Sequence, residues 1–185
     1  MNTFRIDPGD EHVVLLVAPS GLGKTTACLR TVELAQARGL RVAGVLSPPV
    51  YQGQVKTAIA LRDVVTRQER ILAHANHAGE GPRVGVWTFD PASVAWGQQV
   101  LASLPQCDLL AIDEIGPLEL EMGQGLTNAL DALRSADYRL GLVTLRPALA
   151  GAVAAQLDGL QVSALTLDEQ TRDQTPQIII SQLCS

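Results

Sequence analysis

Residues 13–26 constrain the fold more than any other part of the chain. An apolar run over residues 13–17 is followed by a turn containing Gly21 and Gly23, then by Lys24 and Thr25. The run predicts a buried strand, and residues 25–38 predict a helix that stops at Gly39. The turn between them has the spacing of a loop whose backbone N–H groups surround phosphate oxygens. This segment therefore predicts an α/β fold with an anion site between a strand and a helix.

Each residue type in the loop has a physical role in that chemistry. Glycine lets the backbone curl inward, and the positive end of the following helix faces the same anion. Lys24 is expected to reach the β- and γ-phosphates of a nucleotide, and the Thr25 hydroxyl to ligate Mg²⁺. Ala18 stands where the pattern has glycine, which is tolerable if its φ is negative. The expected nucleotide contacts are Ala18, Pro19, Ser20, Gly21, Leu22, Gly23, Lys24, Thr25 and Thr26.

A second motif is the apolar run Leu-Leu-Ala-Ile at 109–112 that ends in Asp113 and Glu114. An aspartate at the end of a buried strand beside such a loop can hold Mg²⁺, usually through water, and we predict this role for Asp113. A neighbouring carboxylate can orient and deprotonate a water that attacks the γ-phosphate, and we predict this role for Glu114.

Two further catalytic candidates lie at the end of the next strand. The Thr144 hydroxyl is placed to contact the γ-phosphate or the attacking water, and Arg146 follows two residues later. An arginine from the same chain can stabilise the charge of the transition state. A β-branched strand end and a surface arginine remain the alternative interpretations of these two residues.

The rest of the chain alternates strands and helices. We expect strands at 42–46, 83–89, 109–112, 140–144 and 162–167, and helices at 91–104, 147–157 and 175–183, with another marked by Leu126, Ala129, Leu130 and Leu133. Residues 47–53 read as a loop, and 55–73 as an antiparallel hairpin added to the parallel strands. The prediction is one domain over residues 1–185, with a mainly parallel sheet and helices on both faces.

Composition narrows the function classes. The net charge is -5, and the chain has no broad basic field for a nucleic-acid backbone. Cys28, Cys107 and Cys184 have no metal-type spacing, and we expect them to be reduced and mostly buried, as in a cytoplasmic protein. We expect no signal peptide at residues 1–11 and no membrane span. His74 and His77 are predicted to be surface residues at a helix end rather than metal ligands.

The string Ile-Asp-Glu-Ile-Gly-Pro-Leu-Glu-Leu at 112–120 is more specific than an acidic strand end. With Pro-Ser-Gly-Leu-Gly-Lys-Thr-Thr at 19–26, it resembles the small P-loop nucleoside-triphosphatases that include cancer-related nucleoside-triphosphatase. The resemblance implies a P-loop fold and Mg²⁺-dependent hydrolysis of ATP, GTP and other nucleoside triphosphates to diphosphates. The roles of Lys24, Thr25, Asp113 and Glu114 carry over, and that of Arg146 less closely.

The resemblance covers most of the chain, including residues 55–73, 84–87 and 167–172. The departures are Ala18 for glycine, Leu145 where many members have histidine before an arginine, and Thr171 instead of asparagine before Arg172. Aromatic residues make up 3% of the chain, and none lies in an obvious base-stacking motif, which agrees with broad nucleotide tolerance.

Two other functions remain open from the sequence. A small-molecule or nucleoside kinase would use the same loop and metal site, with Arg62, Arg67 and Arg70 of the hairpin as a lid. A nucleotide-binding switch that does not hydrolyse would suit the changes at positions 18 and 145. We expect nucleoside triphosphates as partners, no nucleic acid or membrane, and a monomer.

Overall fold

The structure, a computed structural model, describes residues 11–76 and 78–184. Its strands form one mixed sheet in the order β10-β1-β9-β8-β2-β4-β5-β7-β6, with β3 paired to β4. The strands are β1 (His12–Val17), β2 (Val42–Leu46), β3 (Pro49–Gln52), β4 (Val55–Asp63), β5 (Glu69–Ala75), β6 (Arg83–Val84), β7 (Trp87–Phe89), β8 (Leu109–Ile112), β9 (Leu140–Leu145) and β10 (Gln161–Thr166).

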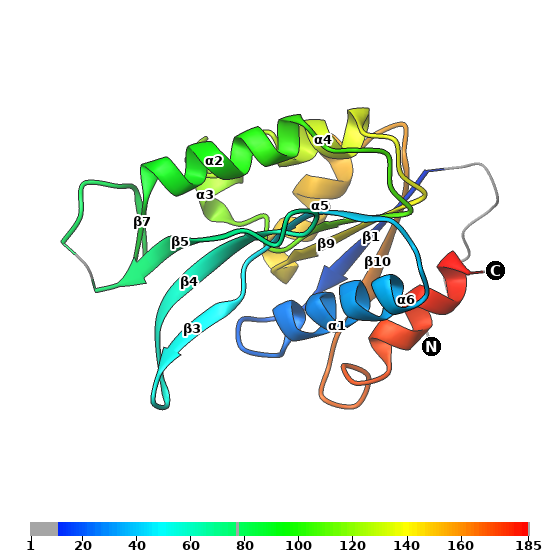
Figure 1. Cartoon of the computed structure of the whole chain (residues 1–185), viewed down its shortest axis with the longest axis horizontal. Helices are drawn as coiled ribbons and strands as arrows, with labels where there is room; N and C mark the ends of the chain where they lie inside the picture. The colour runs from blue at the N-terminus through cyan, green and yellow to red at the C-terminus, as the bar shows by residue number, and fades with distance from the viewer. Residues whose placement is uncertain (1–10, 77, 185) are drawn as a thin grey trace.

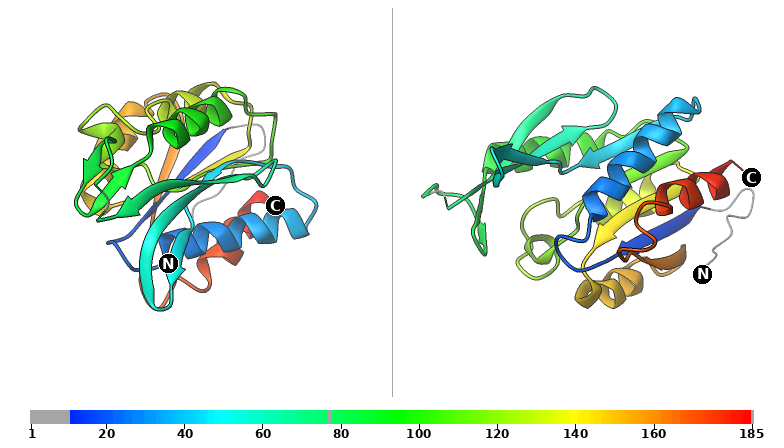
Figure 2. Two further views of the ribbon diagram at one scale, coloured as in Figure 1. Left: turned by 60° about the vertical axis from the view of Figure 1, so that its left-hand side comes forward. Right: turned by 90° about the horizontal axis from the view of Figure 1, so that it is seen from below.

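The strands from β10 to β2 run parallel, and those from β4 onward are antiparallel to their neighbours. The antiparallel part lies on the opposite side of the molecule from the C-terminus (Figure 1; Figure 2). The helices are α1 (Lys24–Ala37), α2 (Pro91–Ala102), α3 (Pro117–Leu120), α4 (Ala129–Ser135), α5 (Pro147–Gln156) and α6 (Thr175–Leu183).

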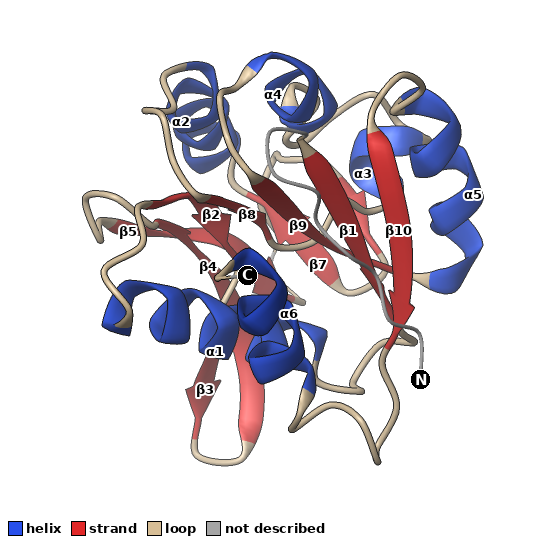
Figure 3. Cartoon of the chain, turned by 90° about the vertical axis from the view of Figure 1, so that its right-hand side faces the viewer, coloured by secondary structure: helices blue, strands red, loops and turns tan. Residues whose placement is uncertain are grey.

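Helices cover both faces of the sheet, as predicted. Helices α1 and α6 lie together on one face, while α2, α4 and α5 lie on the other (Figure 1; Figure 3). Strand β1 shows why two cores form, because successive side chains of a strand point to opposite faces. Val13, Leu15 and Val17 belong to the core under α2, α4 and α5, and Val14 and Leu16 to the core under α1 and α6. A strand buried on both faces must be apolar throughout.

The antiparallel hairpin at 55–73 is confirmed as β4 and β5, but two expectations for this region were wrong. Strand β3 occupies part of the predicted loop at 47–53, where Pro49 is tolerated because β3 pairs only with β4 and lies at an edge. The single strand predicted at 83–89 is divided into β6 and β7, which pair with each other. Gly85, with φ of +58°, makes the turn between them.

Three smaller expectations also needed correction. His74 lies in strand β5 rather than at a helix end, and His77 lies outside the described residues. The helix expected from Leu126 begins only at Ala129, although Leu126 still packs in the same core. The short helix α3 follows Gly116 and was not predicted, because four residues are too few to show a helical period.

The topology brings the predicted site residues to one edge of the sheet. Strands β1, β8 and β9 are parallel neighbours, so their carboxyl ends lie side by side. The loop at 18–23 follows β1, Asp113 follows β8, and Thr144 lies near the end of β9. Ligands of open parallel sheets bind at this edge. Among the described residues, no helix combines the length and apolar character needed to cross a bilayer.

The assignment of Asp90 as the N-terminal cap of α2 can be tested by mutation. The Asp90 carboxylate accepts a hydrogen bond from the Ser93 N–H at 2.8 Å, with Pro91 as the first helical residue. Asp90→Ala is expected to lower the free energy of unfolding by about 1 kcal/mol, because one helix N–H loses its acceptor. Asp90→Asn keeps an acceptor and is the matched control. Chemical denaturation measures both, and equal stability of the Ala variant and the wild type would contradict the assignment.

The pH dependence of this cap has a definite sign. Hydrogen bonds from Ser93 lower the pKa of Asp90. The stabilisation is therefore complete above the unfolded pKa of about 4 and is lost as pH falls through the lower folded value.

Candidate active site at the carboxyl edge of the sheet

The loop after β1 has the backbone that its glycines suggested. Gly21 and Gly23 have φ of +84° and +91°, values that side chains other than glycine rarely adopt. Among the described residues other than glycine, φ is positive only at Arg67, Asn76 and Glu114, so Ala18 keeps the ordinary backbone that its side chain needs. The departure from glycine at position 18 therefore leaves the loop conformation unstrained.

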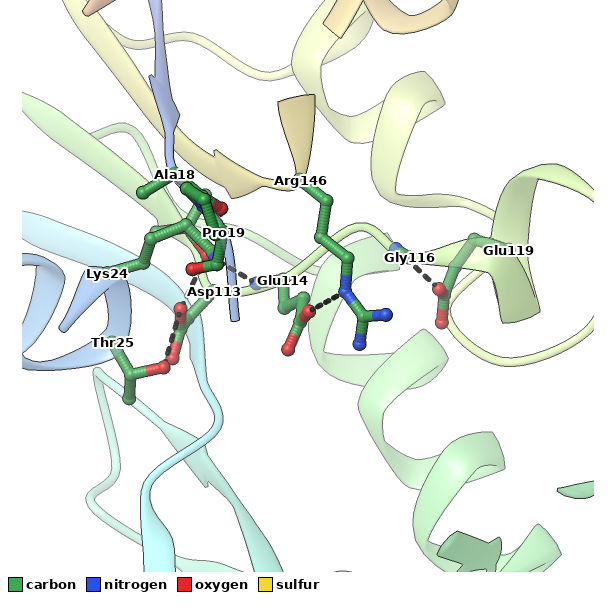
Figure 4. A network of polar contacts seen from close by, with 10 residues as sticks. Ala18, Pro19, Lys24, Thr25, Asp113, Glu114, Gly116, Glu119 and Arg146 are labelled. Carbon is green, nitrogen blue, oxygen red and sulfur yellow. Dashed lines mark hydrogen bonds and ion pairs between the residues drawn. The ribbon is translucent and has the colours of Figure 1, made fainter. Parts of the chain in front are cut away.

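Lys24 lies inside the curve of this loop (Figure 4). Its ammonium Nζ donates to the carbonyl oxygens of Ala18 at 2.8 Å and Pro19 at 3.1 Å, and the residue is 7% exposed. Burial lowers the pKa of Lys24, while the carboxylate of Glu114 raises it. In the described structure, the N–H groups of Gly21 and Gly23 have no protein acceptor. The loop thus places one ammonium and free backbone donors together at the start of α1, where the helix dipole is positive.

Asp113 is the most enclosed charged residue of the site, with no exposed surface. Its Oδ1 accepts from the Thr144 hydroxyl at 2.7 Å and the Thr25 hydroxyl at 3.3 Å, and its Oδ2 accepts from the Ser47 N–H at 3.2 Å. Burial raises the pKa of Asp113, and these hydrogen bonds lower it. A buried carboxylate needs such partners, and here they come from α1, β9 and the segment after β2.

Glu114 follows with a φ of +71°, a conformation that is costly for a residue with a Cβ. Two hydrogen bonds hold it: the Glu114 N–H donates to the Thr144 hydroxyl at 3.1 Å, and the Ile115 N–H to the Thr144 carbonyl at 3.2 Å. The Glu114 carboxylate accepts from Arg146 Nε at 3.3 Å, and both side chains are partly exposed (Figure 4). The strained backbone therefore turns this carboxylate away from the core and toward the loop edge.

Thr144 is central to the site in a way that the sequence did not indicate. It was predicted to contact phosphate or water, but its hydroxyl is fully buried and engaged with Asp113 and Glu114. Thr144 therefore lies on the buried side of Asp113 and Glu114. Leu145, which stands where many resembling proteins have histidine, is buried in the core under α2, α4 and α5.

Glu119 is a site residue that sequence reasoning missed. Its carboxylate oxygens accept from the Gly116 N–H at 2.9 Å and the Leu126 N–H at 3.0 Å, which ties the loop after β8 to the segment before α4 (Figure 4). Burial raises the pKa of Glu119. A detectable signal was present, because a glutamate three residues after Gly116 with proline between them is the pattern of a helix start.

The hairpin side of the site is occupied by Lys56 and Trp87, not by the predicted arginines. Lys56 Nζ lies 4.8 Å from the centroid of the Trp87 ring. Desolvation lowers the pKa of Lys56, and the carboxylates of Glu114 and Asp113 raise it. Lys56 and Glu114 line the same cavity.

The arginines suggested as a kinase lid lie elsewhere. Arg62 pairs with Glu69, and Arg70 lies over the ring of Trp96 on α2. Arg62 and Arg67 line a surface groove beside α1. The chain's other candidate, Arg172, comes close to the loop, since a Cβ on Gly23 would lie 3.9 Å from Arg172 Cδ.

Comparison with known proteins places this site in context. The chain matches the profile of the NTPase family over residues 13–180. It is 32% identical over 174 residues to "Nucleoside-triphosphatase THEP1" of Thermofilum pendens, covering 92% of this chain and 94% of that protein. The protein of the same name from Methanosarcina acetivorans is 28% identical, covering 91% and 95% of the two chains.

Two solved structures share the fold. The human cancer-related nucleoside triphosphatase superposes with a TM-score of 0.68 at 22% identity, covering 92% of this chain and 96% of that one. THEP1 from Aquifex aeolicus superposes with a TM-score of 0.66 at 17% identity, covering 93% and 98%.

The position of Thr144 leads to a stability prediction. Thr144→Val removes a donor from the buried Asp113 carboxylate and an acceptor from the Glu114 N–H, with little change of shape. We expect the free energy of unfolding to fall by about 1–3 kcal/mol, the cost of leaving buried polar groups unpaired. Thr144→Ser keeps the hydroxyl and is expected to lose less. Denaturant unfolding of the three proteins checks this, and a Val variant as stable as the Ser variant would contradict it.

Proposed function

Because the chain belongs to the NTPase family and is a nucleoside-triphosphatase, we propose that it hydrolyses ATP, GTP and other nucleoside triphosphates to diphosphate and phosphate, with Mg²⁺ and with Glu114 activating the water. One observation carries the proposal. Lys24 and Thr25 at the start of α1 and Asp113 and Glu114 after β8 meet at one edge of the sheet, where hydrogen bonds of Asp113 join the two segments to each other and to β9.

The loop and its lysine account for substrate binding. The N–H groups of the 18–23 loop and the Lys24 ammonium form a cradle for the β- and γ-phosphates. Arg172 beside Gly23 adds a positive charge at the same loop. These groups bind phosphate and are not proposed to contact the base, which supports activity on nucleoside triphosphates with different bases. The two cations, Lys24 and Arg172, would neutralise part of the charge of a bound polyanion, although the chain carries a net charge of -5.

The donor set around Asp113 fits a magnesium ion. The Thr25 hydroxyl donates a hydrogen bond to Asp113 Oδ1. The lone pairs of the Thr25 oxygen therefore remain available to ligate a cation. The Asp113 carboxylate is positioned by three donors, so it can accept from metal-bound water. In the described part of the chain no group of three or more His, Cys, Asp or Glu side chains could hold a metal, so phosphate oxygens and waters would complete the coordination. When bound, Mg²⁺ supplies neutralisation of charge on the phosphates.

Glu114 is the group proposed to hold the attacking water. Its carboxylate is partly exposed beside Arg146, and it accepts the water's proton as the new bond to the γ-phosphorus forms. The bond from that phosphorus to the β-phosphate oxygen breaks, and the diphosphate leaves. Arg146 is paired with Glu114 and lines the same cavity as Ser20 of the loop, and we assign to it the stabilisation of charge on the transferred group. Thr144 acts through Glu114 and Asp113, as a positioning residue.

The proposal extends to domain organisation, oligomeric state, partners and location. We propose that residues 1–185 work as one domain and as a monomer, and that the protein acts on free nucleotides rather than nucleic acid or membranes. A cytoplasmic location agrees with Cys28, Cys107 and Cys184, which are all free thiols, the first two buried.

Glu114→Gln tests the proposed function directly. The amide keeps the shape but cannot take the proton, so kcat is expected to fall about 10²–10⁴-fold while nucleotide binding is nearly unchanged. Glu121→Gln removes an exposed acid of the same region and is the control. Phosphate release with a panel of nucleoside triphosphates measures turnover. Wild-type rates in the Gln variant would exclude Glu114 as the base, and tight binding without turnover by the wild type would indicate a switch.

Thr25 provides a separate test of the metal. Thr25→Ala removes the proposed ligand, so the Mg²⁺ concentration for half-maximal phosphate release should rise about tenfold or more. Thr25→Ser keeps the hydroxyl and should respond like the wild type. An unchanged Mg²⁺ dependence in the Ala variant would contradict this ligand assignment.

A further inference from the structure

A cavity of about 110 Å³ adjoins the Glu114 carboxylate. One side is formed by residues that surround the proposed reaction centre: Ser20 of the loop, Ser47, Glu114 and Arg146. Most of the other lining residues come from β4, β5, β7 and α3, the antiparallel part of the sheet with the short helix after β8. The cavity therefore extends from the place where the γ-phosphate is expected, toward the hairpin and away from α6.

Its size exceeds what hydrolysis needs. One water requires about 10–15 Å³ of cavity volume, whereas an engineered cavity of about 150 Å³ holds benzene. The cavity beside Glu114, at about 110 Å³, has room for a small ring. A nucleoside or a polymer strand would exceed it.

Part of its wall is apolar and aromatic. Ile59, Leu72, Trp87, Phe89 and Leu118 line it, and Leu72 and Leu118 are almost fully buried. Trp87 and Phe89 are only partly buried, although aromatic side chains are scarce in this chain at 3%. These side chains offer an apolar face against which a small ring can pack. Lys56, over the Trp87 ring, adds a cation at the rim.

The lining also includes the ion pair of the proposed reaction centre. The Glu114 carboxylate and the Arg146 guanidinium lie 3.3 Å apart between Oε1 and Nε, while the other carboxylate in the lining, that of Glu119, is held by two backbone N–H groups. An apolar ring in the cavity would thus present a polar substituent to Glu114. A hydroxyl is the substituent that a carboxylate base accepts a proton from.

We propose, building on the proposed nucleoside-triphosphatase function, that this cavity binds a small one-ring alcohol whose hydroxyl accepts the γ-phosphoryl group in place of water. The alcohol oxygen forms a bond to the γ-phosphorus, and the bond from that phosphorus to the β-phosphate oxygen breaks. The hydroxyl proton passes to Glu114. The products are a nucleoside diphosphate and a phosphomonoester of the alcohol, and hydrolysis is the reaction when the cavity holds water.

The test uses the full chain with Mg²⁺ and ATP, and with benzyl alcohol or 4-(hydroxymethyl)benzoate as the probe. Phosphorus NMR follows the phosphomonoester and inorganic phosphate in the same sample. Leu72→Trp fills the cavity from β5. Ile71→Trp is the matched control, because Ile71 is the adjacent residue on the same strand, is 37% exposed and does not line the cavity.

We expect phosphomonoester from at least one probe, an about tenfold or larger loss of it in Leu72→Trp, and near wild-type yield in Ile71→Trp, with phosphate release similar in all three. Phosphate release without phosphomonoester from either probe would overturn the inference and leave the proposed function standing. Equal phosphomonoester yields from Leu72→Trp and the wild type would show that the alcohol does not bind in this cavity, and would overturn the inference. Absence of both products from the wild type would overturn the proposed function and the inference with it.

Discussion

The buried carboxylate of Asp113 is the interaction on which the rest of the site depends. Its oxygens accept hydrogen bonds from Thr25, Thr144 and Ser47, which lie in segments far apart in the sequence. An unpaired carboxylate in this position would cost several kcal/mol, so the fold is stable only with these segments in register. The same bonds that satisfy the charge therefore fix the loop lysine, the Thr25 hydroxyl and Glu114 relative to one another.

The strained backbone of Glu114 determines where its carboxylate lies. A positive φ is unfavourable for glutamate, yet here it is maintained by two bonds to Thr144 and by the turn that Glu119 holds at Gly116. A negative φ at Glu114 would change the direction in which its side chain leaves the backbone. The conformation instead aims its carboxylate at the loop edge and at the cavity under β5 and β7. One strained residue thus connects the phosphate loop to the antiparallel part of the sheet.

Much of this was predictable from the sequence, for identifiable reasons. Fully apolar runs such as Leu109–Ile112 identify buried parallel strands, and Asp90-Pro91 identifies a helix start, because both patterns are local. The edge at which Lys24, Asp113 and Thr144 meet follows from the parallel topology alone. Strand β3 and the turn at Gly85 were not predictable, because they depend on pairing with distant strands rather than on local pattern. The burial of Thr144 behind the carboxylates, and the cavity lined by Trp87, are likewise tertiary features.

The central claim is that the loop lysine and the carboxylate of Glu114 serve the same terminal phosphate. The most direct measurement is a crystal structure of the full chain with Mg²⁺ and a β,γ-imido triphosphate. The account predicts the γ-phosphate in contact with Lys24 Nζ, and a water between that phosphate and the Glu114 carboxylate on the side opposite the leaving oxygen. A triphosphate bound in the loop with Glu114 directed to another surface, and no water between them, would contradict it.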